Sequence, residues 1–264
     1  MSVHYACIVP HSPALIPTIG KQELSKLEHT IKQLEYIKEQ LSEREIETLV
    51  LIAPHNESSK RKEEFLIHLP SLYISGFEEF GDLVTKKEYT PDPVLAHAIK
   101  KDLEQDGFSV SYVSEKKLEY SAGVPLYYLI KNTSQKLIVI HPAEVPLKKQ
   151  FEFGRNLQKS LQKHEKKIAC VISGDLSHCL SENAPGGFAP EATTFDQEVV
   201  SFVKAGKIRK LQKIDTDLAH RLGACGIPPI LLLFGFLDHM NHEAHFLSYE
   251  APLGVGQFVM EFVF

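Results

Sequence analysis

Four histidines stand at or just beyond the ends of predicted strands, and their side chains could bind a metal. They are His11, His55, His141 and His178. Neutral imidazole is a ligand for Fe, Zn and Cu, and two imidazoles with one anionic side chain make a three-point site that leaves positions open for a substrate. A single histidine at such a position is more often a polar residue satisfied at the edge of a sheet. Together they predict a metal site.

The segments that would carry these histidines are short runs made almost entirely of apolar residues, at positions 4–10, 48–53, 136–140 and 168–173. Strands that are covered on both faces show such continuous runs, whereas strands with one solvated face alternate between apolar and polar residues. We therefore interpret the four runs as buried strands. Further strands are expected at 65–69, 108–113, 244–249 and 257–264.

Between these strands, apolar residues recur at the spacing of an amphipathic helix. In residues 24–41 they are three or four positions apart, at Leu27, Ile31, Leu34, Ile37 and Leu41. Helices are also expected at 94–106, 151–164, 195–203, 211–222 and 230–237, and residues 184–190 are expected to form a surface loop. This alternation predicts an α/β fold with one domain over residues 1–264, whose largely parallel mixed sheet is covered by helices on both faces. Ligands of such sheets bind beyond the carboxyl ends of the strands, where the four histidines stand.

The composition excludes several classes of partner. The net charge is -5, and the lysines are interspersed with acidic residues, so the sequence predicts no nucleic-acid partner. The longest apolar run, near 227–237, is too short to span a bilayer, so no membrane association is expected. The four cysteines form no CxxC motif and are too sparse for a disulfide framework, which indicates a reducing, cytoplasmic location. The sequence leaves open whether the protein forms a homo-oligomer.

Short motifs follow one another along nearly the whole chain. They are Pro10-His11-Ser12-Pro13-Ala14, Ala53-Pro54-His55, Ser173-Gly174-Asp175-Leu176-Ser177-His178, Ala184-Pro185-Gly186-Gly187, Cys225-Gly226 and Tyr249-Glu250 with Gly254-Val255-Gly256. Their order resembles that of class III extradiol dioxygenases, in the catalytic subunit of the LigB type, and of the related Memo-like proteins. The resemblance implies the same α/β fold. It also implies a small aromatic substrate, a catechol, and O2.

The resemblance further implies a ligand set. In dioxygenases of this type the histidines matching His11 and His55 bind Fe(II), and a glutamate supplies the third ligand. That glutamate falls on Cys225 here, and Memo is similar in having a cysteine. A His2Cys site favours Zn or Cu more than a carboxylate site does, while catalysis would call for Fe(II). Without the resemblance, Cys225 could be a buried small residue at a helix start, and Glu250 is the fallback third ligand.

The resemblance assigns His178 the role of acid and base toward a catechol hydroxyl and oxygen. Asp175, three residues earlier, could orient His178 or cap the following turn. Tyr120 stands where relatives commonly have a histidine; it can donate a hydrogen bond but is a poor base near pH 7, and it could equally be a packing residue.

Three functions compete on this basis. The first is a nonheme metal-dependent extradiol ring-cleavage dioxygenase, and the second is a Memo-like protein that binds Cu, Zn or Fe for redox or partner functions without ring cleavage. A third is a metal-dependent hydrolase, since Zn-bound water needs only these ligands and a base. The run His239, His242 and His245 suggests a separate metal site, but the polar residues around it favour a solvated turn.

Overall fold

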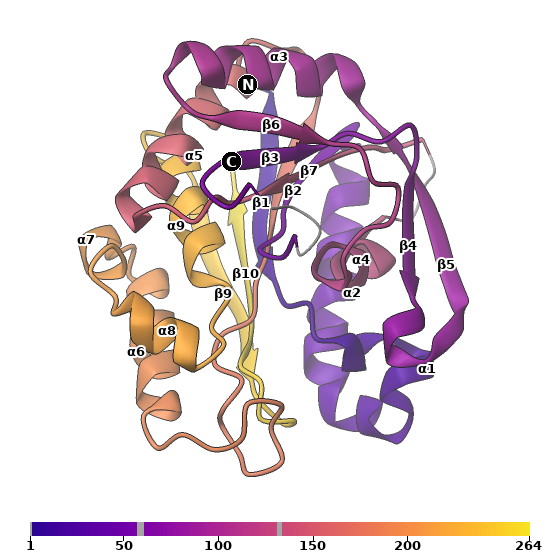
Figure 1. Cartoon of the computed structure of the whole chain (residues 1–264), viewed down its shortest axis with the longest axis vertical. Helices are drawn as coiled ribbons and strands as arrows, with labels where there is room; N and C mark the ends of the chain where they lie inside the picture. Colours follow the sequence, from indigo (N-terminus) through magenta and orange to yellow (C-terminus); the bar gives the residue numbers. More distant parts are fainter. Residues whose placement is uncertain (1, 57–60, 131–133) are drawn as a thin grey trace.

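Four parallel strands form the centre of a ten-stranded sheet in the computed structural model, which describes residues 2–56, 61–130 and 134–264 (Figure 1). In spatial order they are β7 (Lys136–His141), β2 (Thr48–Ile52), β8 (Ile168–Ser173) and β1 (Val3–Val9). Nearly all of their residues are buried, as expected for strands covered on both faces. The strands that lead to His11, His55 and His178 are therefore neighbours in one sheet, as predicted.

The outer strands make the sheet mixed. Beyond β1 lie β10 (Gln257–Val263) and β9 (Glu243–Glu250), both antiparallel to their neighbours. Beyond β7 lie β5 (Asp82–Pro91), which is parallel to it, and β4 (Tyr73–Phe77), which is antiparallel to β5. Two further strands, β3 (Phe65–His68) and β6 (Val110–Val113), attach to β7 through β3.

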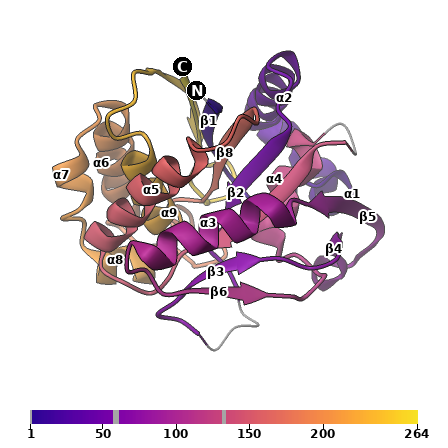
Figure 2. The same cartoon turned by 90° about the horizontal axis from the view of Figure 1, so that it is seen from above.

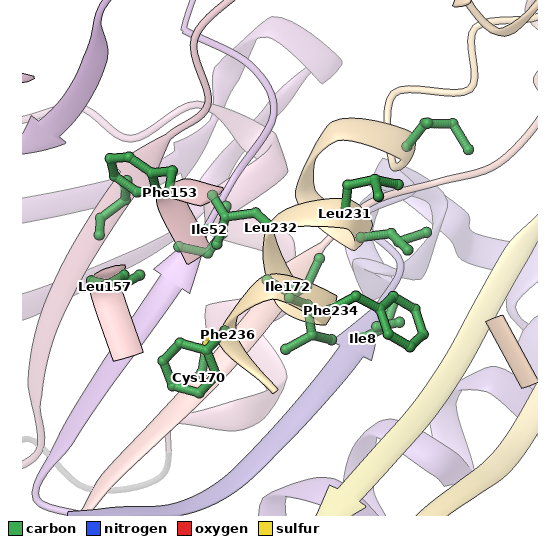
Figure 3. Close-up of a cluster of buried hydrophobic side chains, with 14 of the residues drawn as sticks. Ile8, Ile52, Phe153, Leu157, Cys170, Ile172, Leu231, Leu232, Phe234 and Phe236 are labelled. Atoms are coloured by element: carbon green, nitrogen blue, oxygen red, sulfur yellow. The ribbon is translucent and has the colours of Figure 1, made fainter. Parts of the chain in front are cut away.

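Helices cover both faces of this sheet, which confirms the predicted single-domain α/β architecture (Figure 2). One face packs against α3 (Pro93–Gln105), α5 (Leu147–Leu161), α6 (Ala192–Lys204) and α9 (Ile227–Phe236), and the other packs against α2 (Glu28–Glu43) and α4 (Tyr120–Leu129). Side chains of each strand alternate between the two cores: in β8, Ile172 joins the first and Val171 the second. Figure 3 shows part of the first core, where side chains of α5, such as Phe153, and of α9, such as Leu232, gather over the strand residues Ile52 and Ile172.

Short helical turns connect the main elements. They are η1 (Pro13–Leu15), α1 (Pro17–Gly20), η2 (Lys21–Leu27), η3 (Glu78–Phe80), α7 (Ile208–Leu211) and α8 (Thr216–Arg221). The prediction of one helix over 211–222 is wrong, because the chain turns between α7 and α8. The Asp215 side chain accepts the backbone N–H of Leu218 at 2.9 Å and so begins a new helix there.

Three elements give too weak a pattern to be predicted from the sequence. No strand was predicted where β4 and β5 lie, and β5 exposes half of its residues at the side of the sheet. Helix α4 is almost entirely buried and contains Pro125, so it lacks the one-sided periodicity of an amphipathic helix. Across the described ranges, no helix has the length and apolarity needed to cross a membrane.

Candidate metal centre

Three side chains from distant parts of the chain meet beyond the carboxyl ends of β1 and β2. His11 follows β1, His55 follows β2, and Cys225 lies in the turn between α8 and α9. One ligand atom from each of them lies within 4.8 Å of the others. His11 is fully buried, and His55 and Cys225 are partly buried. The sheet thus supplies two of the side chains, and a turn from the other half of the chain supplies the third.

Hydrogen bonds decide which nitrogen of His11 can bind a cation. Its Nδ1 lies 2.9 Å from the hydroxyl oxygen of Ser173, and that hydroxyl donates its own proton to the carbonyl oxygen of Ser121 at 2.5 Å. The Ser173 oxygen must therefore accept from His11, so Nδ1 carries the proton and Nε2 keeps a free lone pair. Burial, with a smaller effect of His178, lowers the pKa of His11 to about 3. Its Nε2 therefore offers an uncharged lone pair, 3.5 Å from the Cys225 sulfur.

The position of Cys225 depends on two glycines that touch. A Cβ atom on Gly174 would lie only 2.6 Å from the Cα of Gly226. This close approach lets the Gly226 N–H donate to the Asp175 carbonyl oxygen at 2.9 Å and brings Cys225 beside His11. Burial, and then the nearby Asp175 carboxylate, raise the pKa of the Cys225 thiol, so it keeps its proton until a cation displaces it.

The donor set fits a transition metal. Two imidazoles and one thiol that can become a thiolate are the ligands that Zn, Cu and Fe take in proteins. A buried neutral imidazole next to a protonated thiol gives a site with no net charge, so a divalent cation entering it meets no fixed positive charge from these groups. The residues therefore fit the metal that the sequence analysis expects.

Asp175 lies between His11 and His178. Its Oδ1 accepts the backbone N–H of His11 at 3.0 Å, and its Oδ2 lies 3.6 Å from Nε2 of His11 and 3.9 Å from Nε2 of His178. Burial raises the pKa of this carboxyl, and His178 opposes that effect. The Asp175 carboxylate therefore lies beside both histidines, and its role in orienting His178 stays a prediction.

His178 presents an imidazole nitrogen that is buried and has no hydrogen-bond partner, its Nε2 atom. Its backbone N–H donates to the Leu222 carbonyl oxygen at 2.7 Å, and its ring rests against Gly223, where a Cβ would lie 3.1 Å from the His178 Cβ and Cγ. The side chain is 24% exposed. His178 stands beside the three candidate ligands without belonging to their group, and its nitrogen can give or take a proton there.

Tyr120 begins helix α4 and forms an aromatic wall of the site. Its ring stacks on His55 with centroids 5.5 Å apart, and it meets His11 edge to face at 5.6 Å. Phe80 meets the Tyr120 ring edge to face, with centroids 5.3 Å apart. Tyr120 therefore packs on both histidines. Its neighbour Phe80 was not identified from the sequence. Ser173 was also missed as a site residue, although its place just before Gly174-Asp175 was a usable signal.

Other candidate residues lie elsewhere. Glu250 accepts both the N–H and the hydroxyl of Thr30 at its Oε1 atom, at 2.9 and 2.5 Å, which holds this side chain near the start of α2. His141 ends β7 but is outside the group of three. Of the three histidines expected in a solvated turn, His245 lies instead in β9, where a strand over 244–249 was also predicted, with its Nδ1 3.0 Å from the buried Glu261 carboxylate.

Comparisons with known proteins identify the family and the fold of this chain. A family model described as the catalytic LigB subunit of aromatic ring-opening dioxygenase matches residues 5–260. Protein CA_C1420 of Clostridium acetobutylicum is 28% identical over 272 residues, which cover 99% of this chain but 58% of that protein. The crystal structure of the uncharacterized protein JW3007 from Escherichia coli K12 matches with a TM-score of 0.67 and 14% identity, covering 99% of this chain and 100% of that one. That structure is similar in fold alone.

Proposed function

The chain belongs to the LigB family of aromatic ring-opening dioxygenase catalytic subunits, and from this premise we propose that it is an extradiol ring-cleavage dioxygenase. Its substrates would be a catecholic aromatic and O2. The observation that carries the proposal is the group formed by His11, His55 and Cys225 with the unpartnered Nε2 of His178 beside it. A metal site next to a histidine able to move protons is what this chemistry needs.

We propose Fe(II) as the metal, held by Nε2 of His11, by His55 and by the Cys225 thiolate. Bound there, it would supply the Lewis acidity and the electron transfer that ring opening by O2 requires. Zn and Cu are the alternatives, because a thiolate ligand favours them more than a carboxylate does. The Ser173 hydroxyl supports ligation by fixing the His11 tautomer.

The protein's own groups would bind the catechol and move its protons. His178 would accept a proton from a catechol hydroxyl at Nε2 and later return it to the product. Asp175, 3.9 Å away, would orient the ring and stabilise its protonated form. The aromatic side chains of Tyr120 and Phe80 would pack against the substrate ring and exclude water. Tyr120 could also donate a hydrogen bond to a substrate oxygen.

A Memo-like metal-binding protein without ring cleavage is the second candidate. Two features favour it: Cys225 takes the place of the family glutamate, and Tyr120 takes the place of a histidine. On this account the same His2Cys group would bind Cu, Zn or Fe for a redox or partner-binding role.

The test is metal analysis of anaerobically purified protein, followed by oxygen uptake with a panel of catechols after loading with Fe(II). We expect one metal per chain, and oxygen consumed in step with the appearance of a ring-opened product. Cys225→Ala should lose the metal, while Glu250→Gln should keep it. Iron-loaded protein that consumes no oxygen with any catechol would favour the Memo-like role instead.

A further inference from the structure

Helix α6 carries a carboxylate on the side that faces the core, at Asp196. The buried positions of this helix are three or four residues apart: Ala192, Phe195, Asp196, Val199 and Val203. Asp196 is fully buried, and burial raises the pKa of its carboxyl to about 6. An apolar side chain here would avoid the cost of burying a charge, so we expect this carboxylate to serve its contacts rather than the core.

Two hydrogen bonds engage the Asp196 carboxylate. Its Oδ1 accepts the backbone N–H of Ser177 at 3.0 Å, and its Oδ2 accepts the hydroxyl of Tyr249 at 2.7 Å. Gly256 lies against the same carboxylate, since a Cβ atom there would be 2.1 Å from Oδ2. A glycine at this position therefore lets the start of β10 pack against the carboxylate. Asp196 thus connects α6 to the residue that precedes His178.

The backbone of Ser177 and His178 is hydrogen-bonded at both N–H groups and both carbonyl oxygens. One of these four bonds is the contact of the Ser177 N–H with Asp196. The other three, at 2.7 to 2.9 Å, join backbone atoms of Gly256, Leu222 and Gly186. Bonds between backbone atoms do not depend on the side chains, so Asp196 supplies the bond of these four that a substitution can remove.

We propose that Asp196 is a positioning residue for His178: it holds the backbone of Ser177 so that the His178 ring stays beside Asp175 and the candidate metal centre. The inference rests on the proposed ring-cleavage function, in which His178 moves protons, and adds a residue that acts through His178 without touching substrate or metal. Proton transfer needs the ring within hydrogen-bond reach of the substrate, so a displacement of about 1 Å would slow it by roughly a hundredfold.

Two substitutions of Asp196 test the proposal in metal-loaded protein. Asp196→Ala removes the acceptor of the Ser177 N–H and should lower kcat for a catechol roughly tenfold to a hundredfold, with KM and metal content unchanged. Asp196→Asn keeps an amide oxygen as the acceptor and should restore kcat to within about threefold of the native value.

Asp92 offers a matched control at the opposite end of the sheet. It is also a fully buried carboxylate that accepts a hydroxyl, from Thr48 at the start of β2, and a backbone N–H, from Leu95. Asp92→Asn should therefore leave kcat unchanged. A loss of turnover in Asp92→Asn as large as that in Asp196→Ala would overturn the proposal, because any buried carboxylate would then have the same effect.

A double-mutant cycle with His178 separates positioning from a general loss of structure. In a His178→Ala background, Asp196→Ala should cause little further loss of turnover, because the ring that it positions is gone. Equal fold losses in the native and His178→Ala backgrounds would overturn this inference and leave the proposed function standing.

A measurement without turnover keeps the two proposals distinguishable. In metal-free protein labelled with ¹⁵N at histidine, the ring signals of His178 should shift in Asp196→Ala and stay in place in Asp92→Asn. If Asp196→Ala does not fold, Tyr249→Phe replaces it, since this change removes only the second hydrogen bond of the carboxylate and should shift the same signals. Unchanged His178 signals overturn the inference. If the native protein cleaves no catechol, the proposed function falls, and the His178 signals alone decide whether Asp196 holds this ring.

Discussion

The candidate ligands differ in protonation before a metal arrives. His11 is neutral at pH 7, because burial lowers its pKa to about 3, and Ser173 leaves its lone pair on Nε2. Cys225 is a thiol, because burial and Asp175 raise its pKa above the ordinary value. A metal therefore binds His11 without displacing a proton and must displace one from Cys225.

This difference predicts proton release on metal binding. Titration of metal-free protein with Zn²⁺ at pH 7, in buffers of different ionisation enthalpy, should show about one proton released per ion. The affinity should rise about tenfold per pH unit while the thiol stays protonated. Cys225→Ala should release none, and Glu250→Gln should behave like the native protein. Binding without proton release would mean that the sulfur is not a ligand.

A variant of His178 tests whether metal binding and proton transfer depend on different residues. His178→Ala should leave the metal content unchanged, because this residue is not among the three candidate ligands, and should lower catechol turnover by roughly 10²–10⁴, the usual contribution of a positioned acid or base. Metal analysis and oxygen uptake on the same sample measure both quantities. His97→Ala, at an exposed position on α3, is the control. Loss of metal in the His178 variant would instead make this residue a ligand.

At the scale of elements, the site depends on how closely two loops approach. The loop after β8 and the turn before α9 meet at Gly174 and Gly226, where a single Cβ would come within 2.6 Å of backbone. Backbone cannot yield as a side chain can, so a methyl group there must push the turn, and Cys225 with it, away from His11.

Gly174→Ala should therefore weaken metal binding by at least about tenfold and reduce the free energy of unfolding by about 1–3 kcal/mol. Titration with Zn²⁺ and urea unfolding of the metal-free protein measure the two effects. Gly76→Ala is a matched control, since its Cβ would meet the flexible end of Glu78 at 2.9 Å and that side chain can move. Unchanged affinity in Gly174→Ala would show that the turn tolerates displacement.

At the scale of the whole molecule, buried titratable groups make the stability of the fold depend on pH. His11 and His141 both have a folded pKa of about 3 against an ordinary value of 6.5, chiefly because of burial. Between these values the unfolded chain binds more protons, so each histidine lowers stability as the pH falls from 6.5. Burial raises the pKa of Asp196 to about 6, so the folded chain takes up a proton there first and this carboxyl raises stability as the pH falls through 6.

His141→Gln should therefore make acid unfolding less steep. Between pH 6 and pH 4, the slope of the unfolding free energy of metal-free protein should fall by about 1.4 kcal/mol per pH unit, the contribution of one proton. Asp196→Asn should instead steepen it, since the compensating proton uptake is lost. Urea unfolding at a series of pH values gives both slopes, with His97→Gln as the control. Parallel curves for His141→Gln and the native protein would contradict a neutral, buried His141.

The sequence by itself determined which segments form the central strands. Continuous apolar runs predict strands covered on both faces, because only such strands can be apolar throughout, and histidines after them predict a site at the carboxyl ends. The family motifs added His178 and Cys225. The prediction of one helix over 211–222 was wrong because the N-terminal cap at Asp215 outweighs the apolar spacing. Strand β5 was not predicted because its exposed side chains show no pattern of core residues.

Only the tertiary structure decided which of these residues meet. His11 and Cys225 are 214 positions apart, and their sulfur-to-nitrogen contact depends on the touching backbones of Gly174 and Gly226. The tertiary structure also showed that Glu250 accepts a hydrogen bond from Thr30 and that His141 lines a cavity. The physical reason is that local pattern fixes which face of an element is buried, whereas contacts between elements depend on their packing in three dimensions.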